Sequence, residues 1–148
     1  MNEFRQRPRG TFINTANWEE LYILSKHWKS DLLFYKEDSN FLHRLIKKYF
    51  IWLTKSKNIE MVRKIEIKVN KINKECETLL NRVNEHIKLF ETIEKDQELK
   101  DDTIFRREHE RLEDEISKFV KEFRENRKEV FKITEYVVDS EQLVSILE

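Results

Sequence analysis

Apolar residues recur alternately three and four positions apart between Ile59 and Val137, in two long runs separated by a polar stretch. This spacing is the a/d heptad repeat of helices that pack against one another, and each run sustains it for more than four heptads. The first run contains Val62, Ile65, Val69, Ile72, Cys76, Leu79, Val83, His86, Phe90 and Ile93. The second run contains Phe105, His109, Leu112, Ile116, Phe119, Phe123, Asn126, Val130, Ile133 and Val137. The pattern predicts two long helices that pair as an antiparallel hairpin.

The polar stretch between the runs predicts a turn centred near residues 97 and 98. An antiparallel hairpin about this point sets residues of the two runs level in mirror pairs, so that Val83 lies level with Leu112. The same symmetry places His86 opposite His109. The hairpin is therefore predicted to bring two of the four histidines into one core layer.

A further helix is predicted before the hairpin. Asn17, followed three residues later by Glu20, is a capping-box pattern that marks a helix start, and nothing breaks the helix before about Lys55. Its main apolar stripe includes Leu21, Trp28, Leu32, Leu42 and Ile46. An adjoining stripe contains His27, Asp31, Phe34, Phe41 and Leu45. A helix that is apolar over so wide an arc is expected to lie in the groove between two others.

The predicted fold is all-α, an elongated antiparallel three-helix bundle that is coiled-coil-like, with helices over about 17–55, 59–95 and 102–139. Residues 140–148 form either a tail or a short fourth helix capped by Ser140. Residues 1–16 contain the only Pro and the only Gly of the chain, and they are predicted to form a flexible basic arm. So few turn-forming residues argue against a sheet.

Charge and composition exclude several classes of protein. The chain has 29 basic and 29 acidic residues, so its formal net charge of zero provides no overall field for nucleic acid or a membrane surface. The longest apolar run is far too short to span a bilayer, and the polar, basic start does not resemble a signal peptide. The single cysteine, Cys76, lies on the apolar stripe, as a buried thiol would. We expect a cytoplasmic protein without a membrane partner.

The histidine layer has two interpretations. Reflecting the first helix through its turn near residues 56 and 57 brings a third histidine close to the level of the pair, and carboxylates lie one helical turn from two of the histidines. A metal site built in this way would use His27, Asp31, His86, His109 and Glu113. Imidazoles with carboxylates suit Zn²⁺ or Fe²⁺ between facing helices. The favoured interpretation is instead a hydrogen-bonded polar layer of His86, His109 and Asp31 that fixes helix register, with Asn126 as a second register marker.

Sequence motifs for catalysis are lacking. The Glu-x-x-His pairs of di-iron bundles are absent, because Leu24, Asn40, Val83 and Arg106 stand three residues before the histidines. The serines follow no nucleophile motif, and the chain contains no glycine-rich phosphate loop. We therefore expect a protein that is not an enzyme and holds no cofactor, apart from the Zn or Fe alternative.

Several apolar residues of the first helix fall off its main stripe and are candidates for binding a partner. They are Tyr22, Ile23, Leu33, Phe50 and Ile51. Exposed apolar groups of this kind suggest a helical protein partner or a homodimer. The predicted function is a non-enzymatic protein-interaction or scaffold protein that self-associates.

The N-terminal arm supports a weaker alternative. Arg5, Arg7 and Arg9 against Glu3 give this segment a local positive charge. Such an arm would suit an acidic protein or nucleic acid, so an accessory protein that associates with nucleic acid is a third hypothesis. Three arginines are a weak signal, and a nucleic-acid partner is not the expected one.

Overall fold

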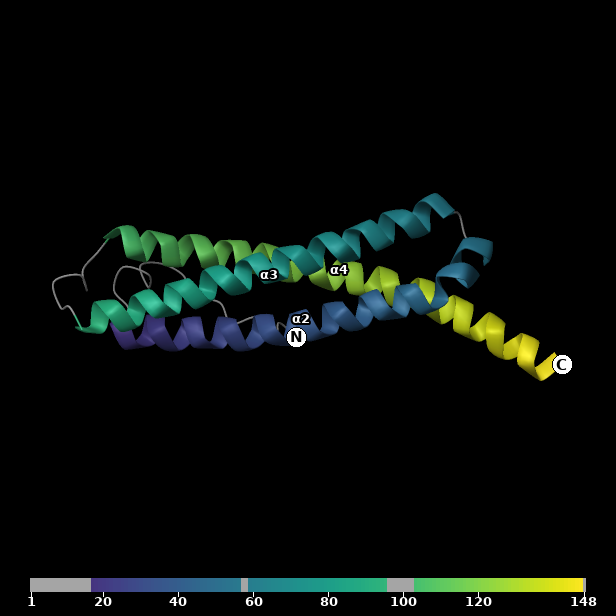
Figure 1. The fold of residues 1–148 in the computed structure, drawn as a ribbon, viewed down its shortest axis with the longest axis horizontal. Coiled ribbons are helices and arrows are strands. Elements are labelled where there is room, and N and C mark those ends of the chain that lie inside the picture. The colour runs from purple at the N-terminus through teal and green to yellow at the C-terminus, as the bar shows by residue number, and fades with distance from the viewer. Residues whose placement is uncertain (1–16, 57–58, 96–102, 148) are drawn as a thin grey trace.

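A computed structural model describes residues 17–56, 59–95 and 103–147, and it describes side chains over 17–50, 59–92 and 105–135. The described residues form three helices, α2 (Trp18–Ser56), α3 (Ile59–Lys95) and α4 (Thr103–Leu147), and contain no strand. Figure 1 shows the three helices side by side in an elongated bundle in which α3 runs antiparallel to both others. The predicted all-α antiparallel three-helix bundle is confirmed.

The helix ends agree with the sequence pattern at one end of the chain and differ at the other. The side-chain oxygen Oδ1 of Asn17 accepts a hydrogen bond of 2.8 Å from the backbone N–H of Glu20, so the expected cap starts α2. Helix α4 continues to Leu147, whereas the sequence predicted an end near 139 and a separate tail or fourth helix over 140–148. No Gly or Pro follows position 10, so nothing in Asp139–Ser140 stops the helix.

The two heptad series form the core. Every residue of the two series whose side chain is described is buried, including His86, His109 and Asn126. On α2 the buried side chains come mainly from the main stripe, with Leu21, Trp28 and Leu32 fully enclosed. Burial of this apolar surface is the main source of stability in such a bundle.

The predicted register of α3 and α4 is observed in ring contacts between the helices. The ring centroids of Phe90 and Phe105, a predicted mirror pair, are 4.7 Å apart with an edge-to-face angle of 88°. The indole of Trp18 on α2 lies 4.6 Å from Phe105 and 5.2 Å from Phe90. These three aromatic rings join the beginning of α2 to both other helices, and such pairs add to the hydrophobic contribution.

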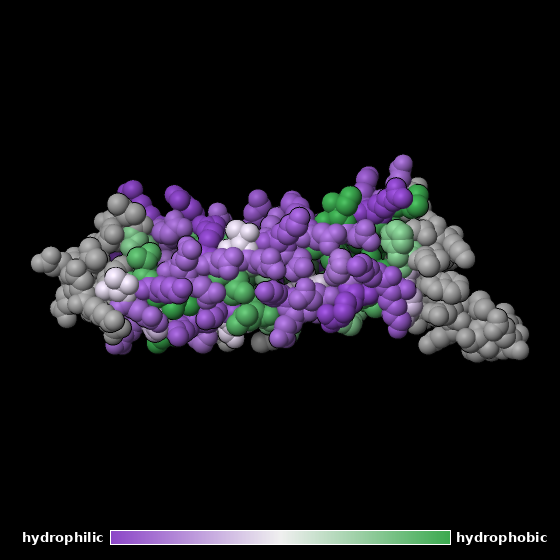
Figure 2. All heavy atoms as spheres, in the orientation of Figure 1, coloured by the Kyte–Doolittle hydropathy of each residue, from purple (hydrophilic) through white to green (hydrophobic). Residues whose placement is uncertain are grey.

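The adjoining stripe of α2 is not buried as predicted. Phe34 is 56% exposed and Phe41 is 42% exposed, although the centroid of Phe41 lies 6.3 Å from that of Phe131 on α4. The reason is geometric: among the described residues α2 packs against α3 and α4, which bury its main stripe and leave the adjoining stripe at the edge of the interface. The visible face in Figure 2 is otherwise mostly hydrophilic, as expected for a helical bundle in water.

Ion pairs join the helices along their outer edges. The guanidinium of Arg127 on α4 lies 2.9 Å from Asp38 on α2, and the ammonium of Lys68 on α3 lies 3.3 Å from Glu129 on α4. Pairs this exposed contribute little individually, so they orient the helices more than they stabilise them.

Within the described part of the chain, no helix is long and apolar enough to cross a lipid bilayer.

Truncating one buried leucine should test the core assignment against an exposed leucine. We expect Leu112→Ala to lower the free energy of unfolding by about 2–5 kcal/mol, because Leu112 is 1% exposed and its loss opens a cavity. The same substitution at Leu89, which is 48% exposed, should change it by less than about 0.5 kcal/mol. Urea denaturation measures both, and equal losses would contradict the assignment of the core.

Candidate functional site

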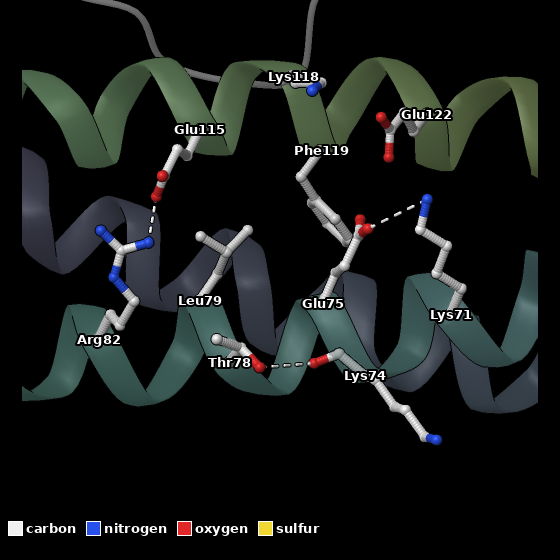
Figure 3. Close-up of a pocket in the computed structure, with 10 residues that line it drawn as sticks. All are labelled: Lys71, Lys74, Glu75, Thr78, Leu79, Arg82, Glu115, Lys118, Phe119 and Glu122. Atoms are coloured by element: carbon white, nitrogen blue, oxygen red, sulfur yellow. Dashed lines mark hydrogen bonds and ion pairs between the residues drawn. The ribbon is translucent and has the colours of Figure 1, made fainter.

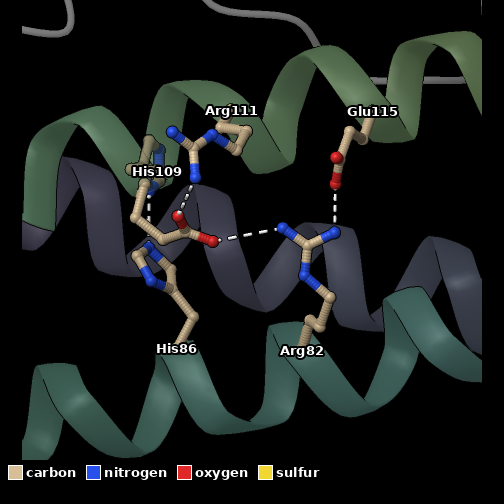
Figure 4. A network of polar contacts seen from close by, with 6 residues as sticks. Arg82, His86, His109, Arg111 and Glu115 are labelled. Atoms are coloured by element: carbon tan, nitrogen blue, oxygen red, sulfur yellow. Dashed lines mark hydrogen bonds and ion pairs between the residues drawn. The ribbon is translucent and has the colours of Figure 1, made fainter.

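A pair of buried histidines joins α3 to α4. The ring nitrogens Nε2 of His86 and Nδ1 of His109 lie 3.0 Å apart, and the two residues are 3% and 0% exposed. One ring donates its N–H to the lone pair of the other, which requires at least one neutral imidazole. Figure 4 shows the two rings facing each other from opposite helices, as the mirror symmetry of the hairpin predicted.

Aromatic rings enclose the histidine pair. The ring of His86 stacks on Phe105 with centroids 4.5 Å apart and planes 8° from parallel, and His109 packs against Trp28 of α2 at 4.4 Å. Burial among these rings lowers the pKa of His86 to about 4 from its ordinary value of 6.5, because an apolar surrounding disfavours the charged form. His86 is therefore neutral near pH 7.

The remaining predicted metal ligands do not extend the histidine pair into a ligand cluster. Among the described residues, no group of three or more His, Cys, Asp or Glu side chains is placed to hold a metal ion. His27 and Asp31 are half-buried on α2, whereas Glu113 is buried on α4. The hydrogen bond between the imidazoles occupies one nitrogen of each ring, Nε2 of His86 and Nδ1 of His109. A Zn or Fe site using these five residues stays a prediction.

The polar core layer is only partly satisfied. Among the described residues, Nδ1 of His86 has no hydrogen-bond partner, and neither does the side-chain amide of Asn126, which is 1% exposed. A buried polar group without a partner costs about 1–3 kcal/mol. Of the predicted hydrogen-bonded layer, the contact between His86 and His109 is observed. The cost is compatible with a layer that specifies register.

Next to the histidines, a charged network bridges α3 and α4. The guanidinium of Arg82 binds Glu115 and lies 3.1 Å from Glu108, which in turn lies 3.3 Å from Arg111. Figure 4 shows Arg82 reaching across from α3 toward α4. Burial would lower the pKa of Arg82, but its hydrogen bonds to the two carboxylates outweigh this and raise it. A permanently charged, doubly paired arginine acts as a clamp between helices.

A groove of about 430 Å³ continues along α3 and α4 from this network. Figure 3 shows the carboxylates of Glu75 on α3 and Glu122 on α4 directed toward each other across it. Burial raises the pKa of Glu75, and the negative charge and hydrogen bonding of Glu122 raise it further. The ammonium of Lys71, 3.8 Å from Glu75, partly opposes this shift.

The groove does not contain the parts of a nucleophilic site. The hydroxyl of Thr78, which lines it, donates to the backbone carbonyl of Lys74 at 3.1 Å. The thiol of Cys76 is buried and contacts the carbonyl oxygen of Leu32 at 3.4 Å, and burial raises its pKa to about 11. A thiol with so high a pKa is a poor nucleophile. The Thr78 hydroxyl and the Cys76 thiol are therefore both engaged by backbone carbonyls of the bundle.

The predicted partner-binding residues of α2 have different environments. Ile23 and Leu33 are 54% and 44% exposed. Tyr22 and Phe50 are half-buried and pack against the core, and the side chain of Ile51 lies outside the described residues. The sequence did not single out Phe34 and Phe41 for binding, although both are exposed. Helical spacing gave the signal, because Ile23, Phe34 and Phe41 fall on one line along α2.

Arg5, Arg7 and Arg9 of the predicted basic arm lie outside the described residues, so the nucleic-acid hypothesis stays a prediction.

Comparison with known proteins identifies no relative of this chain. No protein-family model matches the chain, and neither a curated protein nor a solved structure is significantly similar to it.

Acid should destabilise the bundle through the histidine pair. Because the pKa of His86 falls from 6.5 to about 4 on folding, the unfolded chain binds more protons between these values. The contribution of His86 to the free energy of unfolding is fully present above pH 6.5. It decreases by about 3 kcal/mol as the pH falls to about 4. Urea denaturation across this range should show a smaller loss for His86→Leu/His109→Leu than for the wild type. His43→Gln, a half-buried histidine on α2, is the control, and an unchanged pH slope in the double variant would contradict this assignment.

Glu75 should show the opposite dependence on pH. Its pKa is raised in the folded state, so ionisation at pH 7 opposes folding, and this penalty is relieved as the pH falls through the raised value. We expect Glu75→Gln to raise the urea midpoint at pH 7 and to remove the gain on mild acidification. Glu91→Gln, an exposed glutamate on the same helix, should do neither. A midpoint lowered by Glu75→Gln would show that Glu75 stabilises the bundle as an anion.

Proposed function

We propose that the protein is a non-enzymatic helical interaction or scaffold protein of the cytoplasm, which binds protein partners through the outer face of α2 and also self-associates. The observation that carries this proposal is the line of large apolar side chains on α2. Ile23 and Phe34 are each more than half exposed, and Phe41 continues the line. Large exposed apolar side chains that share one face mark surfaces that bind other proteins.

The edge of this face also has the polar features of an interface. Phe34 lines a depression between α2 and α4 of about 240 Å³ together with Asp38, Arg124 and Arg127. The guanidinium of Arg127 is paired with Asp38 at 2.9 Å and lies 4.6 Å from the ring of Phe131. An aromatic centre bordered by arginine is typical of the residues that dominate binding energy at protein interfaces.

A role without catalysis is supported by how the polar side chains are used. His86 is neutral and hydrogen-bonded to another imidazole, and Arg82 is held by two carboxylates. Thr78 bonds to its own helix backbone. Catalytic groups need a reacting atom within reach, whereas His86 and Arg82 contact side chains of the neighbouring helix. The unreactive environment of the single cysteine suits a reducing compartment, where thiols stay free.

A helical partner fits this surface best. The line of Ile23, Phe34 and Phe41 follows the axis of α2, so a second amphipathic helix would lay its apolar side chains along it. Such a helix would complete the fourth side of the bundle against α2 and α4, where Phe41 already packs near Phe131.

Capture from a lysate of the native cells tests the α2 surface. The immobilised wild-type chain should retain a defined set of proteins, and Ile23→Glu/Phe34→Glu should lose them, because both charges would be buried on binding. Leu89→Glu is the matched control, since Leu89 is a similarly exposed apolar residue on α3. The proposal is contradicted if the double variant, folded by circular dichroism, retains the same proteins as the control.

A further inference from the structure

The end of α4 extends beyond the other two helices. Figure 1 shows its last turns projecting past the end of the bundle where α2 and α3 are joined. From Ile133 to the C-terminus the sequence contains no Lys or Arg but four acidic residues. These are Glu135, Asp139, Glu141 and Glu148. The twelve residues of α4 from 136 to 147 span about 18 Å and form an acidic extension.

The acidic extension also carries an apolar stripe. Val137, Val144 and Leu147 follow Ile133 at helical spacing and so share one face of α4 with it. Ile133 is 7% exposed and belongs to the core of the bundle. The apolar face that α4 uses inside the bundle thus continues in sequence along the acidic extension.

A basic groove lies on the bundle where the acidic extension begins. It has a volume of about 560 Å³ and is formed by α3 and α4. Its apolar part comes from Met61, Ile65 and Ile133. Its charged residues are Lys64, Lys68, Lys132 and Glu129, a local charge of +2 from three lysines and one glutamate. The carboxylate of Glu129 is paired with the ammonium of Lys68 at 3.3 Å. Lys64 and Lys132 are therefore the remaining positive charges of the groove, and both are exposed on its rim.

We propose that the basic groove of one molecule receives the acidic extension of a second copy, and that the second copy reciprocates in a symmetric antiparallel dimer. Ile133 belongs both to the groove and to the stripe of the acidic extension, so the two halves of the interface adjoin on one chain. A two-fold axis near Val137 would bring each acidic extension back along the other bundle. It would set Glu141 of each copy level with Ile133 of the other, beside Lys132.

Charge and hydrophobic pattern together favour this occupant over others. The groove needs a ligand with an apolar face and negative charges for its two rim lysines, and the acidic extension supplies an apolar stripe with Asp139 and Glu141 on a helix already formed. A fatty acid would match the apolar part but has only one carboxylate for the two lysines of the rim. The inference rests on the self-association in the proposed function and names the surface responsible for it.

Charge reversal and charge exchange in the full-length chain test the dimer by sedimentation velocity over a range of concentrations. Lys64→Glu/Lys132→Glu should weaken dimerisation by more than about tenfold, because acidic side chains would then face the acidic extension. Asp139→Lys/Glu141→Lys should weaken it similarly. Combining all four substitutions should restore dimerisation, since the charges are exchanged.

The matched control is Lys88→Glu/Lys121→Glu, which reverses one exposed lysine on α3 and one on α4 away from the groove. It should dimerise as the wild type does. A monomeric wild type at every concentration, equal weakening in the control, or no recovery on charge exchange would overturn the proposal. A wild type that stays monomeric and binds a fluorescent fatty acid would assign the groove to a lipid. Loss of lysate partners in Ile23→Glu/Phe34→Glu is a separate result, so the α2 surface and the dimer can fail independently.

Discussion

The burial of one continuous heptad stripe between α3 and α4 is the constraint on which the other features depend. Apolar layers alone permit neighbouring helices to slide by a heptad, but the hydrogen bond between His86 and His109 favours one register. A slide by a heptad in either direction would separate the two imidazoles and remove that bond, at about 1–3 kcal/mol for each orphaned group. The register then determines which outer charges meet, and so positions Arg82 between Glu108 and Glu115.

The same constraint limits what the interior can do. The aromatic rings that exclude water from the histidine layer also keep His86 neutral, and the hydrogen bond occupies one nitrogen of each imidazole. Lys68 and Arg82 of α3 are engaged by glutamates of α4. The proposed recognition uses the outer surfaces, of which the α2 face and the basic groove beside the acidic extension combine apolar area with defined charge.

Sequence periodicity predicted the bundle because heptad spacing and a polar turn together determine which residues of two paired helices lie level with each other. The contact between Phe90 and Phe105 is an example. The same mirror relation sets Arg82 level with position 113, which lies between its two partners Glu108 and Glu115, but it does not tell which side of α4 the guanidinium reaches. Periodicity does not determine how far around its axis a helix is covered, so Phe34 and Phe41 were wrongly assigned to the core. For the same reason, His27 and Asp31 were predicted to lie near the level of the histidine pair, but they do not form a metal-ligand group with it among the described residues. The end of α4 was predicted wrongly because Asp139 and Ser140 favour helix ends but, unlike Pro, do not prevent a helix from continuing.

A formal net charge of zero conceals an uneven distribution along the chain. All charged residues after Lys132 are acidic, while three lysines border the groove that adjoins this segment. At physiological ionic strength charges are screened beyond about 8 Å, so this asymmetry exerts little attraction at long range. It acts once two molecules are in contact, where it distinguishes an antiparallel arrangement of acidic extensions from one that places like charges together. Apolar area would supply the affinity of such a contact, and charge would select its orientation, just as the histidine pair selects the register of the apolar layers within one molecule.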